Sequence, residues 1–108
     1  MLKTMDATAL KAKLFRGFAD PTRLTILETL LEGERSVGEI AQMTEVSSAN
    51  VSAHLACLAG CGLVRGEKRG KYVYYRLQER RVRDLIKIAE GILANVSRQI
   101  YECTHTAR

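Results

Sequence analysis

Residues 36–61 read SVGEIAQMTEVSSANVSAHLACLAGC, and this stretch decides the fold. Ser36 stands three positions before Glu39, which is the spacing of a capping box at the start of a helix. Residues 44–47, Thr-Glu-Val-Ser, then predict a tight turn. The apolar side of the short helix before this turn is supplied by Val37, Ile40 and Ala41.

A second helix is predicted to begin at Ser47 or Ser48 and to end near Gly60 and Gly62, because glycine readily stops a helix. Two short helices joined by a tight turn form a helix-turn-helix, which is the motif predicted for this region. The inward positions of the second helix, at helical spacing, are Val51, Leu55 and Leu58.

Two further helices are predicted before this motif, within residues 6–32. Asp20 and Pro21 are typical of the N-cap and the first position of a helix. The buried face of that helix is predicted to contain Leu24, Leu27 and Leu31. Apolar residues at helical spacing predict an earlier helix from Asp6 to Gly17, and these residues are Leu10, Leu14, Phe15 and Phe18.

A β-hairpin is predicted in residues 63–77. Its strands are formed by Leu63–Arg65 and Tyr72–Leu77, and Gly66–Gly70 is the basic loop between them. Aromatic residues at alternating strand positions usually pack within a sheet, so they are assigned to packing rather than to base stacking. These aromatic residues are Tyr72, Tyr74 and Tyr75.

A last helix is predicted over residues 78–100, followed by a tail over residues 101–108. One side of this helix is apolar and close to a heptad pattern, which favours a dimer interface shared with the first helix. The chain is therefore expected to be one α+β domain over residues 1–108, mainly α with a β-hairpin wing. It would be a winged helix-turn-helix that dimerises through its terminal helices, with interface residues Leu10, Leu14, Phe18, Leu85, Ala89, Ile92 and Val96.

The distribution of charge favours double-stranded DNA as a partner. The net charge is +5, and between Arg65 and Arg83 eight basic residues accompany two acidic ones. The second helix of the motif also presents short polar side chains suited to phosphates and base edges, although such residues often form only a solvated face. The predicted DNA contacts are Ser47, Ser48, Asn50, Ser52 and His54 on the helix, and Arg65, Lys68, Arg69 and Lys71 on the hairpin.

Several classes of protein do not fit the sequence. No run of about 18 apolar residues is present, and Met1 to Phe15 contains no signal-type apolar block. We therefore expect a cytoplasmic protein that does not enter a membrane. No Ser/His/Asp order, phosphate-binding glycine loop or His-Glu-x-x-His helix occurs, so we expect neither an enzyme nor an organic cofactor.

Three cysteines in a cytosolic chain suggest reduced thiols rather than disulfides. Cys57 and Cys61 lie four residues apart and therefore on one helix face, while Cys103 lies near the end of the chain. Thiolates favour soft ions such as Cd(II), Pb(II), Hg(II) or As(III), and a fourth ligand such as His105 would favour tetrahedral Zn(II) or Cd(II). A thiol redox switch and simple burial as small hydrophobes are the alternatives.

The chain resembles the ArsR/SmtB family of metal-responsive winged-helix repressors over nearly its whole length. The resemblance rests on Ala19-Asp-Pro-Thr-Arg23, Val51-Ser-Ala-His-Leu55, Gly62-Leu-Val64 and Gly70-Lys-Tyr-Val-Tyr-Tyr75. It implies a homodimeric repressor that releases its operator when a metal or metalloid binds.

Two common sensor sites of that family have no counterpart in this sequence. Residues 36–44 contain no cysteine, and no histidine occurs between Arg80 and Ile100. The remaining pattern resembles the CmtR-type subgroup, in which two recognition-helix cysteines and one tail cysteine of the other subunit hold cadmium or lead. The resemblance implies Cys57, Cys61 and Cys103 as ligands of Cd(II) or Pb(II), with a response to As(III), Hg(II), Zn(II) or thiol oxidation as the alternative.

Overall fold

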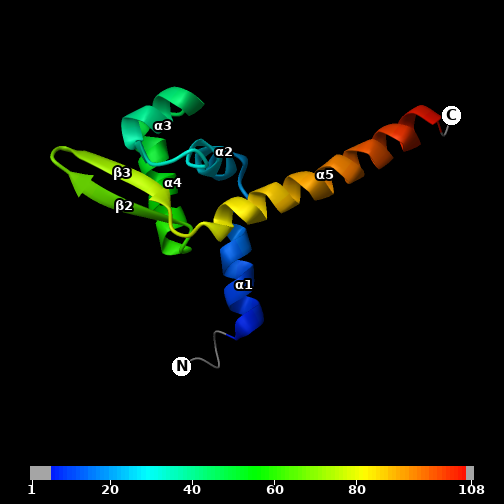
Figure 1. Ribbon diagram of the computed structural model, residues 1–108, viewed down its shortest axis with the longest axis horizontal. Coiled ribbons are helices and arrows are strands. Elements are labelled where there is room, and N and C mark those ends of the chain that lie inside the picture. Colours follow the sequence, from blue (N-terminus) through cyan, green and yellow to red (C-terminus); the bar gives the residue numbers. More distant parts are fainter. Residues whose placement is uncertain (1–5, 107–108) are drawn as a thin grey trace.

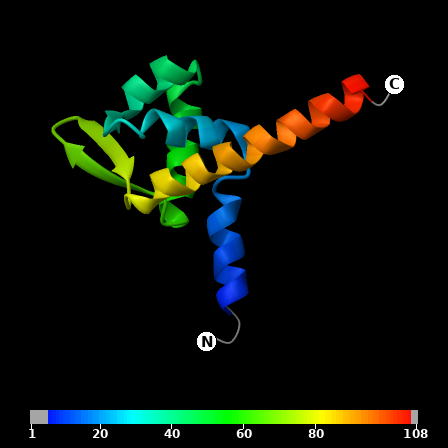
Figure 2. The same ribbon diagram turned by 45° about the vertical axis from the view of Figure 1, so that its right-hand side comes forward.

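The computed structural model describes residues 6–106, and for residue 97 and residues 99–106 it describes the backbone alone. The helices and strands form a winged helix-turn-helix of the α+β class, as predicted. Figures 1 and 2 show a body made of α2, α3, α4 and the sheet, from which α1 and α5 extend in different directions. The elements are α1 (Ala7–Arg16), α2 (Pro21–Thr29), β1 (Arg35–Ser36), α3 (Val37–Thr44), α4 (Ser48–Gly60), β2 (Val64–Arg69), β3 (Tyr72–Leu77) and α5 (Arg81–Thr106).

The predicted helix starts at Asp20 and Ser36 are confirmed by their caps. The Asp20 carboxylate accepts a hydrogen bond from the Arg23 amide at 3.0 Å, and Pro21 is the first residue of α2. At α3 the capping box is complete, because the Ser36 hydroxyl accepts from the Glu39 amide at 3.1 Å and the Glu39 carboxylate accepts from the Ser36 amide at 2.8 Å. These bonds satisfy backbone N–H groups that have no partner within a helix.

The turn of the helix-turn-helix lies at Glu45, which has a left-handed backbone with a φ of 60°. Its amide donates to the Ala41 carbonyl at 2.9 Å, so α3 ends there. The Thr44 hydroxyl donates to the Ile40 carbonyl at 2.7 Å, which adds a side-chain bond to the last turn of α3. This tight connection fixes the start of α4 beside α3.

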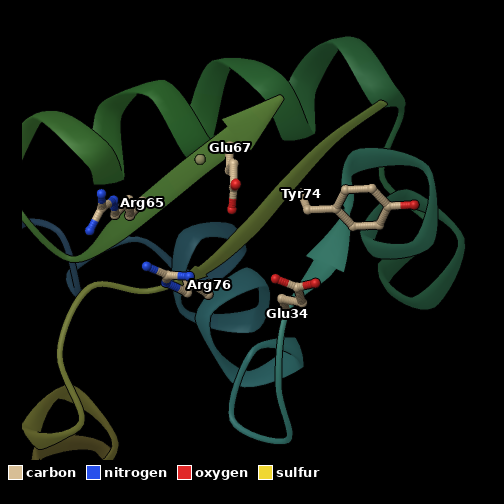
Figure 3. Close-up of a pocket in the computed structure, with 6 residues that line it drawn as sticks. Glu34, Arg65, Glu67, Tyr74 and Arg76 are labelled. Carbon is tan, nitrogen blue, oxygen red and sulfur yellow. The ribbon is translucent and has the colours of Figure 1, made fainter. Parts of the chain in front are cut away.

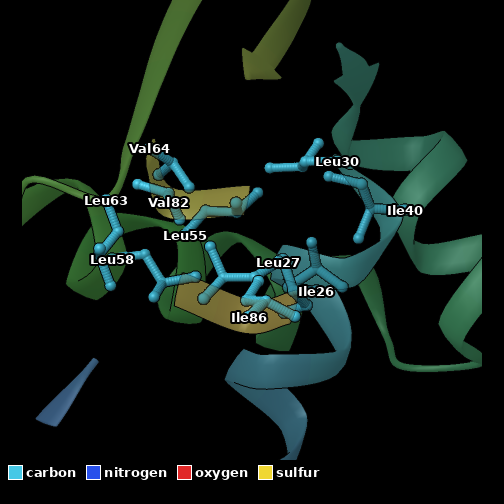
Figure 4. Close-up of a cluster of buried hydrophobic side chains, with 11 residues drawn as sticks. Ile26, Leu27, Leu30, Ile40, Leu55, Leu58, Leu63, Val64, Val82 and Ile86 are labelled. Carbon is cyan, nitrogen blue, oxygen red and sulfur yellow. The ribbon is translucent and has the colours of Figure 1, made fainter. Parts of the chain in front are cut away.

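The core lies where α2, α3 and α4 meet the bases of β2 and α5 (Figure 4). The three inward residues predicted for α4 are all fully buried. In α2, Leu27 is fully buried as predicted, but Ile26 and Leu30 are buried in place of Leu24 and Leu31, which are only half-buried. The buried apolar residues of the described chain are Ile26, Leu27, Leu30, Ile40, Val51, Leu55, Leu58, Leu63, Val64, Val82 and Ile86.

The sheet differs from the predicted hairpin. Its strand order is β1-β3-β2, and the pairing of Arg69 with Tyr72 leaves only Gly70 and Lys71 as the turn. The prediction of a loop over residues 66–70 was therefore wrong. Gly66 lies within β2 opposite Tyr75, where a Cβ atom would approach the tyrosine ring to 2.7 Å, so the glycine permits close packing and does not form a turn.

The last helix also departs from its predicted bounds. The Gln78 amide donates to the Leu63 carbonyl at 2.9 Å, so residues 78–80 connect the sheet to the helix. At the other end, α5 continues beyond Ile100 to Thr106, where a tail was predicted. No glycine or proline occurs after Gly91 to stop it. Within the described residues, no helix has the combination of length and apolar character needed to span a bilayer.

Candidate DNA interface and metal site

The N-terminal half of α4 presents most of its predicted DNA contacts to solvent. Ser48, Asn50 and Ser52 are exposed. Ser47 is exposed as well, but its hydroxyl accepts a hydrogen bond from the Asn50 amide at 3.2 Å and so caps the helix. Three short polar side chains therefore remain available on this helix for contacts with phosphates or base edges.

His54 differs from these residues because it is half-buried and lies near the start of α2. The hydrogen bond from the Arg23 amide holds the pKa of Asp20 below its ordinary value, and the Arg23 guanidinium and the nearby His54 contribute to this lowering. The imidazole is thus near the connection between α1 and α2. This position makes His54 less accessible than the serines at the start of α4.

The basic residues predicted for the wing differ in their surroundings, because one of them is held in an ion pair. Arg65, Lys68 and Lys71 are exposed, and the Lys71 ammonium lies 5.8 Å from the centre of the Tyr72 ring. Arg69, by contrast, forms an ion pair with Glu34 in the loop before β1, with 2.5 Å between Nη2 and Oε2. Both side chains are partly exposed.

A hollow of about 380 Å³ lies on the outer face of the sheet (Figure 3). Val64 and Leu77 face the core, so the residues that alternate with them, including Arg65 and Arg76, face outward. Arg65 and Arg76 are direct cross-strand partners, and like charges at such positions repel each other. Arg76 and Glu34 are not among the predicted site residues, because only the pairing of the strands brings them to the predicted wing residues.

The two cysteines of α4 are free thiols on one side of the helix. Cys57 is exposed, and Cys61 is half-buried at the C-cap of α4, with its amide donating to the Cys57 carbonyl at 3.1 Å. Cys61 lies beside the end of α1, since a Cβ atom on Gly17 would be 3.6 Å from the Cys61 Cβ. Cys57 is thus open to solvent, while Cys61 is partly covered.

The described side chains do not by themselves make a metal site, because no three of their His, Cys, Asp or Glu residues come together. Cys103 and His105, the other predicted ligands, belong to the backbone of α5, but their side chains lie outside the described part of the chain. The two thiols of α4 would therefore need a ligand from beyond the described side chains.

Some of the predicted dimer residues line an apolar hollow of about 240 Å³ between α1, α2 and α5. Phe18, Leu85 and Ala89 line it, while Leu14 and Phe18 also pack against the core. Farther out, Leu10 is 48% exposed and Ile92 is 59% exposed. Further apolar residues along α5, which share this exposure, are Ile88, Leu93 and Val96.

A family model described as "Bacterial regulatory protein, arsR family" matches residues 20–65, which include α2, the helix-turn-helix and the start of the wing. The probable mercury resistance operon repressor of Streptomyces lividans is 39% identical over 93 residues, which cover 86% of this chain and 74% of that protein. The HTH-type transcriptional regulator CmtR of Mycobacterium tuberculosis is 42% identical over 84 residues, which cover 77% of this chain and 71% of that protein.

The fold has a counterpart among solved structures. A homodimeric winged helix-turn-helix DNA-binding domain from Mycobacterium bovis, described as a possible ArsR-family transcriptional regulator, matches with a TM-score of 0.77 and 29% identity. The match covers 86% of this chain and 84% of that domain. The fold, the sequence relatives and the family model agree, so the chain belongs to the ArsR family of transcriptional regulators, which are DNA-binding proteins and not enzymes.

Proposed function

We propose that this protein is a cytoplasmic bacterial repressor that binds operator DNA as a metal-free homodimer. In this proposal it releases the operator when a soft heavy metal, Cd(II) or Pb(II), binds its cysteine thiolates. The observation that carries the proposal is the pair of free thiols, Cys57 and Cys61, on the same helix that exposes the DNA-reading side chains. Relatives named as a mercury operon repressor and as CmtR support a metal effector.

DNA recognition is divided between α4 and the wing. Ser48, Asn50 and Ser52 are exposed and would contact base edges and phosphates, and an asparagine can pair with adenine through two hydrogen bonds. Lys68 and Lys71 near the wing turn are exposed and would neutralise phosphates, which raises affinity for any sequence. The α4 contacts therefore supply sequence preference, and the wing supplies general affinity.

The homodimer is proposed from the apolar faces of α1 and α5 together with the homodimeric state of the M. bovis domain. A second copy would cover Leu10, Ile92 and Val96, which are partly exposed to water in the single chain. A two-fold dimer presents two copies of α4 to half-sites about 34–36 Å apart, so its geometry decides whether both copies can bind.

The metal is proposed to bind between the subunits. Cys57 and Cys61 supply two soft sulfur ligands, and Cys103 of the other subunit would supply the third, with His105 as a possible fourth. Bound metal would fix α4 of one subunit relative to α5 of the other. By linkage, a metal that lowers operator affinity must itself bind the operator complex more weakly by the same factor.

The test compares operator affinity of the fully reduced protein with and without Cd(II) or Pb(II), while charge-transfer absorbance reports thiolate binding. We expect metal to weaken operator binding by about 5- to 150-fold or more. Cys57→Ser and Cys61→Ser should abolish this response, and Cys103→Ser should weaken or abolish it. Ala56→Ser is the matched control, because it adds a hydroxyl at an exposed α4 position without removing a thiol.

Three outcomes would contradict parts of the proposal. An unchanged response in Cys103→Ser would remove that cysteine from the site. Release caused by an oxidant but not by metal would favour thiol oxidation as the signal. An absence of DNA binding by the reduced, metal-free wild type would contradict the repressor itself.

A further inference from the structure

The side chain of Arg69 does not extend toward the wing turn, although its backbone lies beside that turn. Arg69 pairs with Tyr72, next to the turn at Gly70 and Lys71. Its guanidinium nevertheless lies 4.4 Å from the centre of the Tyr74 ring and reaches Glu34 at the base of the sheet. The charged end of Arg69 therefore runs back along the outer face of the sheet, where Glu34 and Tyr74 line the same hollow (Figure 3).

This position is held by acidic groups on two segments. Glu34 accepts from Arg69 Nη2 at 2.5 Å, and a Glu67 carboxylate oxygen lies 3.9 Å from Nε. The hydrogen bond from Arg69 lowers the pKa of Glu34 below its ordinary 4.5, so Glu34 stays charged at neutral pH. As the pH falls through this lowered pKa, Glu34 is protonated and the ion pair is lost. Both partners are therefore charged at the pH where the protein meets DNA.

A guanidinium recognises a carboxylate and a phosphate through the same fork of N–H donors. Arg69 cannot give its full set of donors to both anions. The side chains of Arg69 and Glu34 are 45% and 41% exposed, and an ion pair in such solvent is weak enough to exchange. A DNA phosphate near the wing would thus compete directly with the Glu34 carboxylate.

We propose that Glu34 lowers the affinity of the wing for DNA by competing with backbone phosphates for the Arg69 guanidinium. This inference rests on the proposed function, in which the wing contacts DNA. Glu34 then limits mainly the sequence-independent part of binding, because phosphate contacts dominate that part. An unopposed arginine would strengthen binding to operator and to unrelated DNA alike.

The test uses Glu34→Gln, which removes the charge and keeps the shape, and Glu32→Gln as the matched control. Glu32 is exposed in the same connection between α2 and β1, and no ion pair joins it to another described residue. Affinity is measured for an operator duplex and a scrambled duplex of equal length over a range of salt concentrations.

We expect Glu34→Gln to bind both duplexes about two- to fivefold more tightly, as the loss of a competing surface ion pair allows. Its salt dependence should steepen by up to about 0.9 in the log–log slope, the value of one added phosphate contact. Glu32→Gln should change affinity by less than about half as much, because salt screens distant charges. The gain should disappear in the double variant Glu34→Gln/Arg69→Gln.

Equal gains in Glu34→Gln and Glu32→Gln would overturn the inference, since they would show only a general charge effect. A loss of affinity in Glu34→Gln would also overturn it and make Glu34 a residue that positions the wing.

An NMR titration of the Glu34 carboxyl without DNA tests the ion pair separately. Its midpoint should lie below 4.5 in the wild type and rise in Arg69→Gln. Failure of the wild type to bind either duplex would instead overturn the proposed function together with this inference.

Discussion

The helices α4 and α5 both carry an apolar stripe, but only the stripe of α4 is covered within one chain. Val51, Leu55 and Leu58 of α4 are fully buried between α2, α3 and the sheet. Among the α5 side chains that the structure describes, only Val82 and Ile86 are buried, while Ile92 and the apolar residues near it stay exposed. Helical periodicity thus predicts an apolar face equally well in both helices. It does not say whether the same chain or another molecule covers that face.

The same contrast separates the body from the two extended helices. The body and the start of α5 close the core, whereas α1 has no buried residue and much of α5 lies away from the body (Figure 2). Short helices without packing partners are only marginally stable in water. We therefore expect substitutions in the body to change folding, and substitutions on the far part of α5 to change assembly.

The largest effect on folding is expected from Leu55→Ala in α4. Leu55 is fully buried, so truncation removes apolar contacts and leaves a cavity that the surrounding helices fill only in part. The free energy of unfolding should fall by about 2–5 kcal/mol, measured by urea denaturation. The control is Ser52→Ala, at an exposed position of the same helix. Ala53→Gly would be a poor control, because glycine lowers helix propensity. Equal losses in both variants would contradict the assigned core.

A smaller loss is expected at the junction between the body and α1. Gly17 is buried, and a Cβ atom there would lie 2.4 Å from Leu63 Cδ1. Gly17→Ala should therefore lower the free energy of unfolding by about 1–3 kcal/mol, because it overpacks this contact. Gly91→Ala in α5 is the control, since nothing lies within 4 Å of its added Cβ. A control variant as unstable as Gly17→Ala would contradict the packing argument.

Local signals made the body predictable from sequence. The capping box at Ser36 and the Asp20-Pro21 start of α2 depend on neighbours a few residues away, and the structure contains both. The buried residues of α4 follow from helical spacing alone. Gly66 was assigned to a turn because glycine favours turns, and its actual role depends on Tyr75 in another strand. The two-residue strand β1 is too short to show a periodic pattern.

In the candidate site, too, local spacing was predictable from the sequence, and contacts between distant segments were not. The spacing of Cys57 and Cys61 placed both thiols on one side of α4, but not the half-burial of Cys61 beside Gly17. The sequence identified Arg69 as basic and near the wing turn. Its pairing with Glu34 joins residues 35 positions apart, and such a contact exists only after the sheet has formed. The functional roles of these cysteines and of Arg69 and Glu34 remain predictions.

A modest effect is expected from removing the cap of α3. Ser36→Ala deletes the hydroxyl that accepts the Glu39 amide, and so leaves a backbone donor without its partner. The free energy of unfolding should fall by about 0.5–2 kcal/mol, read from thermal or urea unfolding. Ser48→Ala, at an exposed position that does not cap α4, should have less effect. The reverse order would contradict the assigned capping roles.

The smallest effect on the folding of one chain, and a large one on assembly, is expected from Ile92→Glu. Ile92 is 59% exposed, so a charge there leaves the body intact and should change its intrinsic stability by less than about 0.5 kcal/mol. In the proposed dimer the same charge would be buried against the second copy, which disfavours association.

Sedimentation at micromolar concentration should show two chains for the wild type and one for the variant. The unfolding midpoint should depend on protein concentration only in the wild type, because association adds stability by mass action. Operator affinity should fall by about 10²-fold or more when the two half-sites are no longer bound by one linked dimer.

The control is Ala94→Glu, which adds the same charge at an exposed position about 200° around α5 from Ile92. This variant should remain dimeric. If Ile92→Glu stayed as dimeric as Ala94→Glu, the exposed face of α5 would have some other partner, and the contrast between the two apolar stripes would need a different explanation.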